Sequence, residues 1–130
     1  MKPLLNLTIK RRWLDKIVSG EKREEYRAPD CAQLQNLDRK LLYADRGPGP
    51  MSHPFVVLRA GYGMHSAALA VEIVCIASPI DPKKTTVIPP GPRHPEWGEP
   101  ETPHFTIVLG MHLKAGTYAE VKEWFEGDAK

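Results

Sequence analysis

Short runs of alternating apolar and polar residues limit this chain to a small set of folds. Residues 5–9 alternate in this way, and strand signals recur at 55–59, 68–76 and 105–109; a period of two is typical of half-buried strands. Helical spacing marks 11–18, about 31–42 and about 117–126, so helices do not alternate regularly with strands. The pattern predicts an α+β fold: a small mixed β-barrel of five to six strands with two to three flanking helices.

The length of 130 residues suits one domain, taken here as residues 1–130. The net charge of +2 is too small to indicate a nucleic-acid-binding protein by itself. Residues 1–27, however, hold eight Lys and Arg against four acidic residues. A basic region of this kind suits a partner that carries phosphates, and it is equally common as a solvated helix face.

Several classes of site find no support in the residues. The two cysteines, Cys31 and Cys75, are far apart, so neither a zinc site nor a disulfide framework is expected. The five histidines lack metal-binding spacing, and phosphate-binding glycine motifs are missing. We therefore expect no metal and no cofactor. The first residues lack a signal-peptide core and no apolar run is long enough to span a membrane, which leads us to expect a cytoplasmic protein without a membrane partner.

The most unusual segment is the charged stretch Ser19-Gly20-Glu21-Lys22-Arg23-Glu24-Glu25-Tyr26-Arg27. It follows the helix predicted at 11–18 and has the appearance of a tight turn that leads into a strand. Glu and Lys are depleted in strands, so charge retained there indicates a candidate site. The alternative is an edge strand whose charges deter pairing with other chains.

Strand alternation determines whether the charged residues of this segment can lie on the same side. It places Glu25 and Arg27 on one side and Lys22 on the other, so Lys22 joins Glu25 only from the turn or across a bulge. If the condition is met, Lys22 and Glu25 could exchange protons, because a lysine pKa responds to burial and neighbours. Arg27 would suit a phosphate or a carboxylate.

Other candidate binding residues lie elsewhere in the chain. Lys10 follows the first strand, and Glu72 interrupts an apolar strand, where it is either at a wet surface or paired with a cation. Tyr62 stands between two glycines. Glu96 and Trp97 lie in residues 77–104, which hold eight of the 13 prolines; the tryptophan either stacks on a base or pins this loop to the core.

The segment Gly20-Glu21-Lys22-Arg23-Glu24-Glu25-Tyr26-Arg27 fits the pattern GxKxxExR, and in this it resembles the ASCH domain family, a branch of the PUA-like barrels. The flanking motifs agree with the resemblance: Leu7-Thr8-Ile9-Lys10, Gly61-Tyr62-Gly63, Pro95-Glu96-Trp97-Gly98 and the final strand Ile107-Val108-Leu109-Gly110. The chain looks especially similar to small single-domain ASCH proteins of bacteria and their phages. The resemblance covers about residues 4–113, and the helix at about 117–126 looks like an addition.

The resemblance implies a β-barrel with a cleft in which the motif residues, with Tyr26 beside them, face RNA or a modified nucleoside. It also makes Tyr62 and Trp97 candidates for base stacking. One branch of the family hydrolyses acetylcytidine with a Lys at the position of Lys22 and a Thr at the position of Glu25. Glutamate in place of that threonine counts against a hydroxyl-dependent amidohydrolase. Other members resemble ribonucleases.

Three hypotheses remain open. The first is binding of RNA, a nucleotide or a modified nucleoside in a charged cleft, with Lys10 and Arg27 among the cations and Tyr26, Tyr62, Glu72, Glu96 and Trp97 among the contacts. The second is a hydrolase on a nucleoside amide or an RNA phosphodiester, with Lys22 and Glu25 as catalytic acid and base. The third is a non-catalytic protein-interaction module in which the charges form a structural ion-pair network.

Overall fold

The computed structural model describes residues 2–35, 54–77, 97–98 and 104–127. Within these residues the chain forms five strands and three helices. The strands are β1 (Leu5–Thr8), β2 (Glu24–Arg27), β3 (Phe55–Arg59), β4 (Ala67–Ala77) and β5 (Phe105–Thr117). The helices are α1 (Arg11–Val18), α2 (Ala32–Gln35) and α4 (Tyr118–Gly127).

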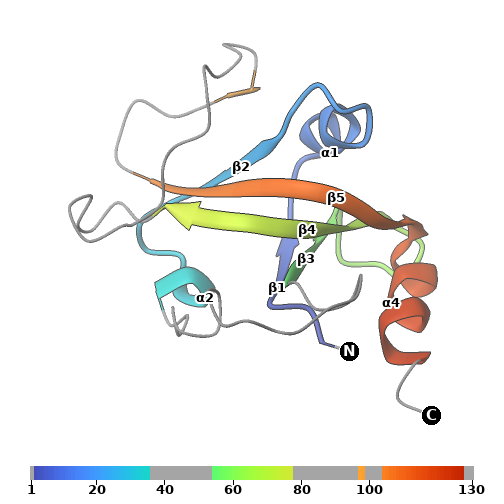
Figure 1. Cartoon of the computed structure of the whole chain (residues 1–130). Coiled ribbons are helices and arrows are strands. Elements are labelled where there is room, and N and C mark those ends of the chain that lie inside the picture. The colour runs from blue at the N-terminus through green and yellow to red at the C-terminus, as the bar shows by residue number, and fades with distance from the viewer. Residues whose placement is uncertain (1, 36–53, 78–96, 99–103, 128–130) are drawn as a thin grey trace.

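The five strands form one mixed sheet that curls into a half-barrel (Figure 1). The strand order is β1-β3-β4-β5-β2, with β1 parallel to β3 and every other neighbouring pair antiparallel. The predicted α+β class, with a small curled sheet and flanking helices, is confirmed. In this order β1 and β2 are the two edge strands.

The free edge of β1 is covered by side chains. Alternate residues of a parallel strand direct their backbone groups to opposite sides, and the Ile9 N–H bonds the Arg59 carbonyl on the β3 side. The backbone N–H and carbonyl of Asn6 bond instead the side-chain amide of Gln33 in α2, at 3.4 and 3.3 Å. The Thr8 carbonyl accepts a 2.7 Å hydrogen bond from Arg27 Nη2 of β2. Arg27 therefore ties the two edges of the sheet together.

Apolar residues are buried on both faces of the sheet. One cluster includes Leu14 and Ile17 of α1 and Leu34 of α2, packed against inward-facing residues from β1, β3, β4 and β5. The second cluster lies on the opposite face, where α4 covers β3 and β4 with Tyr118, Val121, Phe125 and the partly buried Trp124. The apolar stripe predicted for the C-terminal helix is thus confirmed.

Irregular pairing between β4 and β5 changes two expectations. Strict alternation would put Cys75 on the face of Ile73, but the register shifts between Ile73 and Cys75, so that Ile76 enters the core in its place. The last strand was expected to end at Gly110, yet β5 continues to Thr117. Gly110 lies inside this strand rather than at its end. A side chain at this position would collide with Glu72 Oε1 on the neighbouring strand, so glycine suits this position.

Two residue pairs have the sequence spacing of a helix capping box: Asp30 with Gln33, and Thr117 with Glu120. The first pair does not form one, because the Gln33 side-chain amide bonds Asn6 instead. Only the first turn of the helix expected at 31–42 lies within the described residues, as α2. Thr117 and Glu120 do form the second box at the start of α4, with Thr117 Oγ1 accepting from the Glu120 N–H at 3.2 Å and Glu120 Oε1 accepting from the Thr117 N–H at 3.1 Å. The hydrogen bonds that the Thr117 backbone N–H and hydroxyl donate to the Glu120 carboxylate hold the pKa of Glu120 below its usual value.

The capping box yields a prediction about stability. Replacement of Thr117 by Ala removes the hydroxyl that bonds the Glu120 N–H, and N-cap losses of this kind cost about 1 kcal/mol of unfolding free energy. Chemical denaturation of the variant should show this loss, whereas Thr117→Ser keeps the hydroxyl and should retain most of the stability. Equal losses in the two variants would contradict a capping role for the hydroxyl.

Candidate functional site

The turn that follows α1 determines where Lys22 lies. Gly20 ends the helix with a φ of 87°, in the left-handed region that favours glycine. The Lys22 N–H then bonds back to the Lys16 carbonyl at 3.0 Å, which holds Lys22 beside the helix end before β2 begins at Glu24. Lys22 is therefore outside the strand alternation, and its Nζ lies 3.7 Å from Glu25 Oε1. The condition set by the sequence is met through the turn.

The Lys22 ammonium group is almost fully enclosed. The residue is 3% exposed, and Nζ donates a 2.9 Å hydrogen bond to the Trp97 carbonyl. It also lies 4.5 Å from the ring centre of Trp13 and 5.0 Å from that of Tyr26, both within cation–π range. Burial lowers the pKa of Lys22 from its ordinary value, and the nearby Glu25 carboxylate opposes this effect. The amine is thus easier to deprotonate than a lysine in water.

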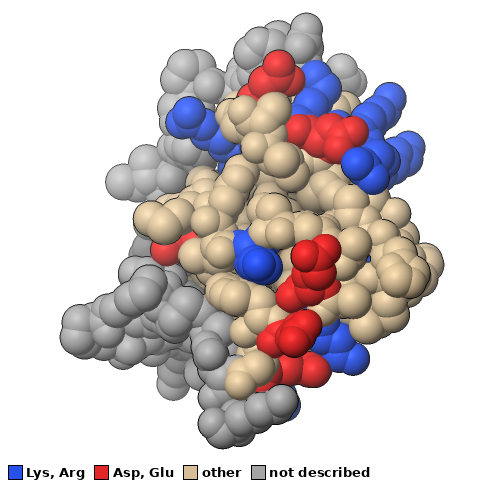
Figure 2. Space-filling model, turned by 90° about the vertical axis from the view of Figure 1, so that its right-hand side faces the viewer, with Lys and Arg blue, Asp and Glu red and all other residues tan. Residues whose placement is uncertain are grey.

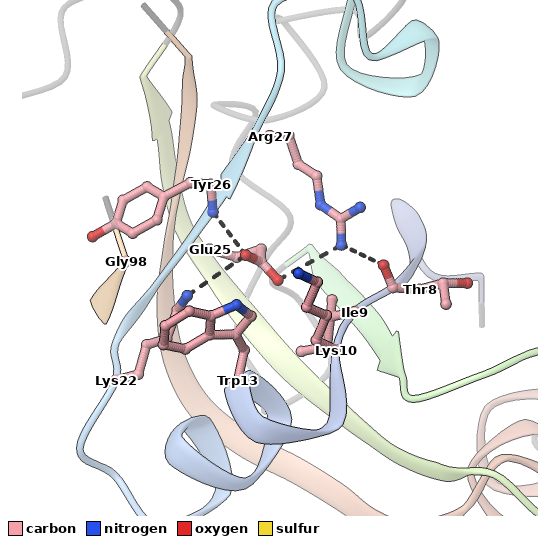
Figure 3. Close-up of a pocket in the computed structure, with 9 residues that line it drawn as sticks. All are labelled: Thr8, Ile9, Lys10, Trp13, Lys22, Glu25, Tyr26, Arg27 and Gly98. Carbon is pink, nitrogen blue, oxygen red and sulfur yellow. Dashed lines mark hydrogen bonds and ion pairs between the residues drawn. The ribbon is translucent and has the colours of Figure 1, made fainter. Parts of the chain in front are cut away.

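Glu25 lies between Lys22 and Arg27 (Figure 3). It is 5% exposed and points to the inner face of β2, on the same side as Arg27. Its Oε1 atom accepts a 2.8 Å hydrogen bond from the Tyr26 N–H, in addition to the ion pair with Lys22. Its Oε2 atom lies 3.6 Å from Arg27 Nη2. The three side chains form a row of cation, carboxylate and cation.

Two atoms of this row are buried without a hydrogen bond. Glu25 Oε2 and Arg27 Nε have no hydrogen-bond partner among the described residues, and the indole N–H of Trp97 shares this property. An unsatisfied buried polar group costs about 1–3 kcal/mol, and such groups are few in native proteins. A buried acceptor and a buried donor on one strand face thus remain unused within the described part of the chain.

The row lies in a pocket of about 330 Å³ at the seam between the two edge strands. The β1 end forms one side of the pocket, α1 and the turn after it form another, and β2 forms a third (Figure 3). The residues that line it are Thr8, Ile9, Lys10, Trp13, Lys22, Glu25, Tyr26, Arg27 and Gly98. Its volume is near the lower limit for small-molecule sites.

Gly98 brings a distant part of the chain against the pocket. Its φ is 77°, and a Cβ atom at this position would lie 2.8 Å from the Trp13 ring. Only glycine meets both requirements without strain. The close approach places the neighbouring Trp97 carbonyl where it accepts the hydrogen bond from Lys22. Residues 97–98 thereby complete the enclosure of the lysine.

The structure brings most of the predicted site residues together. Lys10, Lys22, Glu25, Tyr26 and Arg27 all line the pocket. Trp97 was a candidate for base stacking through its ring, and the contact that it makes with the site is the hydrogen bond that its backbone carbonyl accepts from Lys22.

Three of the predicted residues are not in this group. Tyr62 is 87% exposed, in a loop whose carbonyls accept hydrogen bonds from Arg59, and it does not line the pocket. Glu72 pairs in register with Phe55, which packs under α4, so it points to the opposite face of the sheet. Glu96 lies outside the described residues.

Sequence reasoning missed four lining residues: Thr8, Ile9, Trp13 and Gly98. Trp13 belongs to an apolar helix stripe, and its position is that of an ordinary core residue. Thr8 takes part through its backbone carbonyl, and because every residue type has this group, the identity of residue 8 gives no signal. Gly98 follows a tryptophan in a Pro- and Gly-rich segment, and this was the one available signal for a close backbone approach.

Charge on the surface is distributed unevenly. Figure 2 shows acidic side chains with some basic ones beside them in its lower half, over α4, which carries Glu120, Glu123 and Glu126 as well as Lys122. The charges over α1, at the top of the same view, are mixed, and Arg11 pairs with Asp15 at 2.9 Å. The basic N-terminal region is thus partly neutralised by its own acids, while Lys10 remains exposed at the pocket.

Two further observations concern the described residues alone. In these ranges no group of three or more His, Cys, Asp and Glu side chains comes close enough to hold a metal ion. None of the helices in the same ranges has the length and apolar character needed to cross a membrane.

In the comparisons with known proteins, no family model, curated protein or solved structure matches this chain significantly.

The lowered pKa of Lys22 yields a prediction about pH. Between the native pKa and the ordinary value of 10.5, Lys22 has lost its proton in the folded protein and keeps it in the unfolded chain. The unfolded state then binds more protons, so the unfolding free energy rises with pH in this window. Urea unfolding should therefore show that the unfolding free energy of the wild type increases relative to that of Lys22→Met as the pH approaches 10.5.

A difference between the two proteins that stays constant over this window would show that the folded protein leaves the Lys22 pKa unchanged. A difference that falls with rising pH would show that the Glu25 carboxylate outweighs burial.

Proposed function

We propose that this protein is an ASCH-type domain that binds RNA or a modified nucleoside in the pocket between β1 and β2. The observation that carries the proposal is the convergence of Lys22, Glu25 and Arg27, the charged residues of the GxKxxExR pattern, in one pocket. An isolated surface network of ion pairs would not require a cavity. A cavity beside these buried charges therefore favours a ligand site over a purely structural role for them.

The size of the pocket supports a ligand of one base or one nucleoside. A volume of about 330 Å³ is too small for several stacked nucleotides. A longer RNA would insert a single unstacked base, as proteins that recognise single-stranded RNA commonly do. The aromatic rings of Trp13 and Tyr26 give the pocket apolar walls, and the charged row gives it a polar floor.

The charges at the opening suit the backbone of such a ligand. Lys10 is exposed and lines the pocket, and Arg27 is only partly buried. Cations in these positions can neutralise a phosphate next to the bound base, which makes the affinity dependent on salt. Lys10 forms no part of the buried row, so its substitution tests the ligand contact without disturbing the fold.

The proposal predicts binding that weakens with salt. Fluorescence anisotropy with a labelled single-stranded RNA at about 50 mM salt should detect binding, and Lys10→Gln should weaken it and reduce the slope of log affinity against log salt by about one. Arg27→Gln should weaken it further because Arg27 also forms the pocket wall. Lys122→Gln on α4 removes an equal charge away from this pocket and serves as the control.

No binding to RNA or to nucleosides under these conditions would overturn the proposal. It would also be overturned if Lys10→Gln and Lys122→Gln weakened binding equally, because the affinity would then follow net charge alone.

One observation favours a hydrolase as a second candidate function. A lysine with a lowered pKa lies 3.7 Å from a carboxylate inside the pocket, an arrangement in which the pair can move a proton during attack of water on an amide. We expect acetylcytidine to give cytidine and acetate, with Glu25→Gln and Lys22→Met each lowering turnover at least about 100-fold. Chromatography of the nucleosides measures both. Turnover that is equal in wild type and variants would exclude this pair as the catalyst.

A further inference from the structure

Two of the side chains that line the pocket each carry a buried polar atom without a hydrogen-bond partner among the described residues, and these atoms indicate which part of a nucleotide enters the pocket. Glu25 Oε2 is an acceptor and Arg27 Nε is a donor, and neither has a hydrogen-bond partner among the described residues. Both side chains line the pocket from the same face of β2. We infer that Glu25 Oε2 and Arg27 Nε bind the edge of a base that presents an N–H donor beside an acceptor. This inference rests on the proposed function and specifies the ligand.

The remaining atoms of both side chains are fixed by the protein. Glu25 Oε1 is held by the Tyr26 N–H at 2.8 Å and by the Lys22 ion pair. Arg27 Nη2 donates to the Thr8 carbonyl at 2.7 Å and lies 3.6 Å from Glu25 Oε2. The carboxylate and the guanidinium are thus anchored through one end each, so the acceptor and the donor are held in place before a ligand arrives. Preorganisation of this kind lowers the entropic cost of binding.

The carboxylate decides between a base and a phosphate as the group that is bound. A backbone phosphodiester offers acceptors only, so it can accept from Arg27 Nε but leaves Glu25 Oε2 without a donor. A base edge satisfies both atoms at once: an amino group or ring N–H donates to Glu25, and the adjacent ring nitrogen or carbonyl accepts from Arg27. The base therefore occupies the pocket, and the phosphate lies outside it, beside Lys10.

Nucleoside pairs that differ in one donor test this assignment in the unmodified protein. Cytidine is compared with the pyrimidin-2-one riboside and adenosine with purine riboside, since each analogue lacks the amino group without added bulk; uridine is compared with 3-methyluridine. Calorimetric titration should show that at least one parent nucleoside binds and that loss of its donor weakens binding at least about tenfold. Inorganic phosphate and ribose 5-phosphate should not compete.

Substitution of the acceptor should change this selectivity. Glu25→Gln keeps the shape of the side chain and adds a donor, so the preference for the donor-bearing nucleoside should fall to less than about threefold. Glu123→Gln makes the same chemical change on the exposed side of α4 and should leave the preference intact. A thermal melt of each variant establishes that it is folded.

The possible results separate this inference from the proposed function. If a parent nucleoside and its donor-deleted analogue bind equally, or if inorganic phosphate competes with the nucleoside, the domain binds nucleotides and the assignment of Glu25 and Arg27 is wrong. If no nucleoside and no RNA binds, the proposed function fails and this inference fails with it.

Discussion

The contact between Arg27 and the Thr8 carbonyl connects the fold of this domain to its candidate site. In the described part of the chain, no backbone ladder joins β1 and β2, the two edge strands of the sheet. One guanidinium group supplies the connection, and the same group holds the Glu25 carboxylate within the pocket. The pocket lies where the edges of the half-barrel are joined by a side chain rather than by paired backbone. A complete ladder there would fill the seam with paired backbone.

Burial of so much charge requires close compensation. Lys22 and Glu25 are both nearly enclosed, and a buried ion pair recovers its desolvation cost only when further hydrogen bonds satisfy the remaining atoms. The Trp97 carbonyl and the Tyr26 N–H do this for the lysine and for one carboxylate oxygen. The other carboxylate oxygen remains unsatisfied within the described residues. Stability alone does not explain such an arrangement, which is typical of sites that bind or react.

Much of the fold could be predicted because it depends on local patterns. Alternation and helical spacing identified the strands, α1 and α4, and the Thr117 and Glu120 pair marked the start of the last helix. The bulges between β4 and β5 could not be predicted, since register depends on the partner strand, and they reversed the expected faces of Cys75 and Ile76. In the site, the charged motif could be found from residue types. The contributions of Thr8 and Trp97 could not, because both act through backbone carbonyls.

The geometry of the site depends on the number of residues in the turn between α1 and β2. Lys22 reaches Glu25 because the segment from Gly20 to the start of β2 has a defined length and returns to the Lys16 carbonyl. The exposed side chain of Glu21 in this segment can vary with little effect on that path. A single inserted or deleted residue would instead rotate the lysine away from the carboxylate while leaving every charged group in the sequence. Evolution of this domain can therefore exchange residues in the turn much more easily than it can change their number.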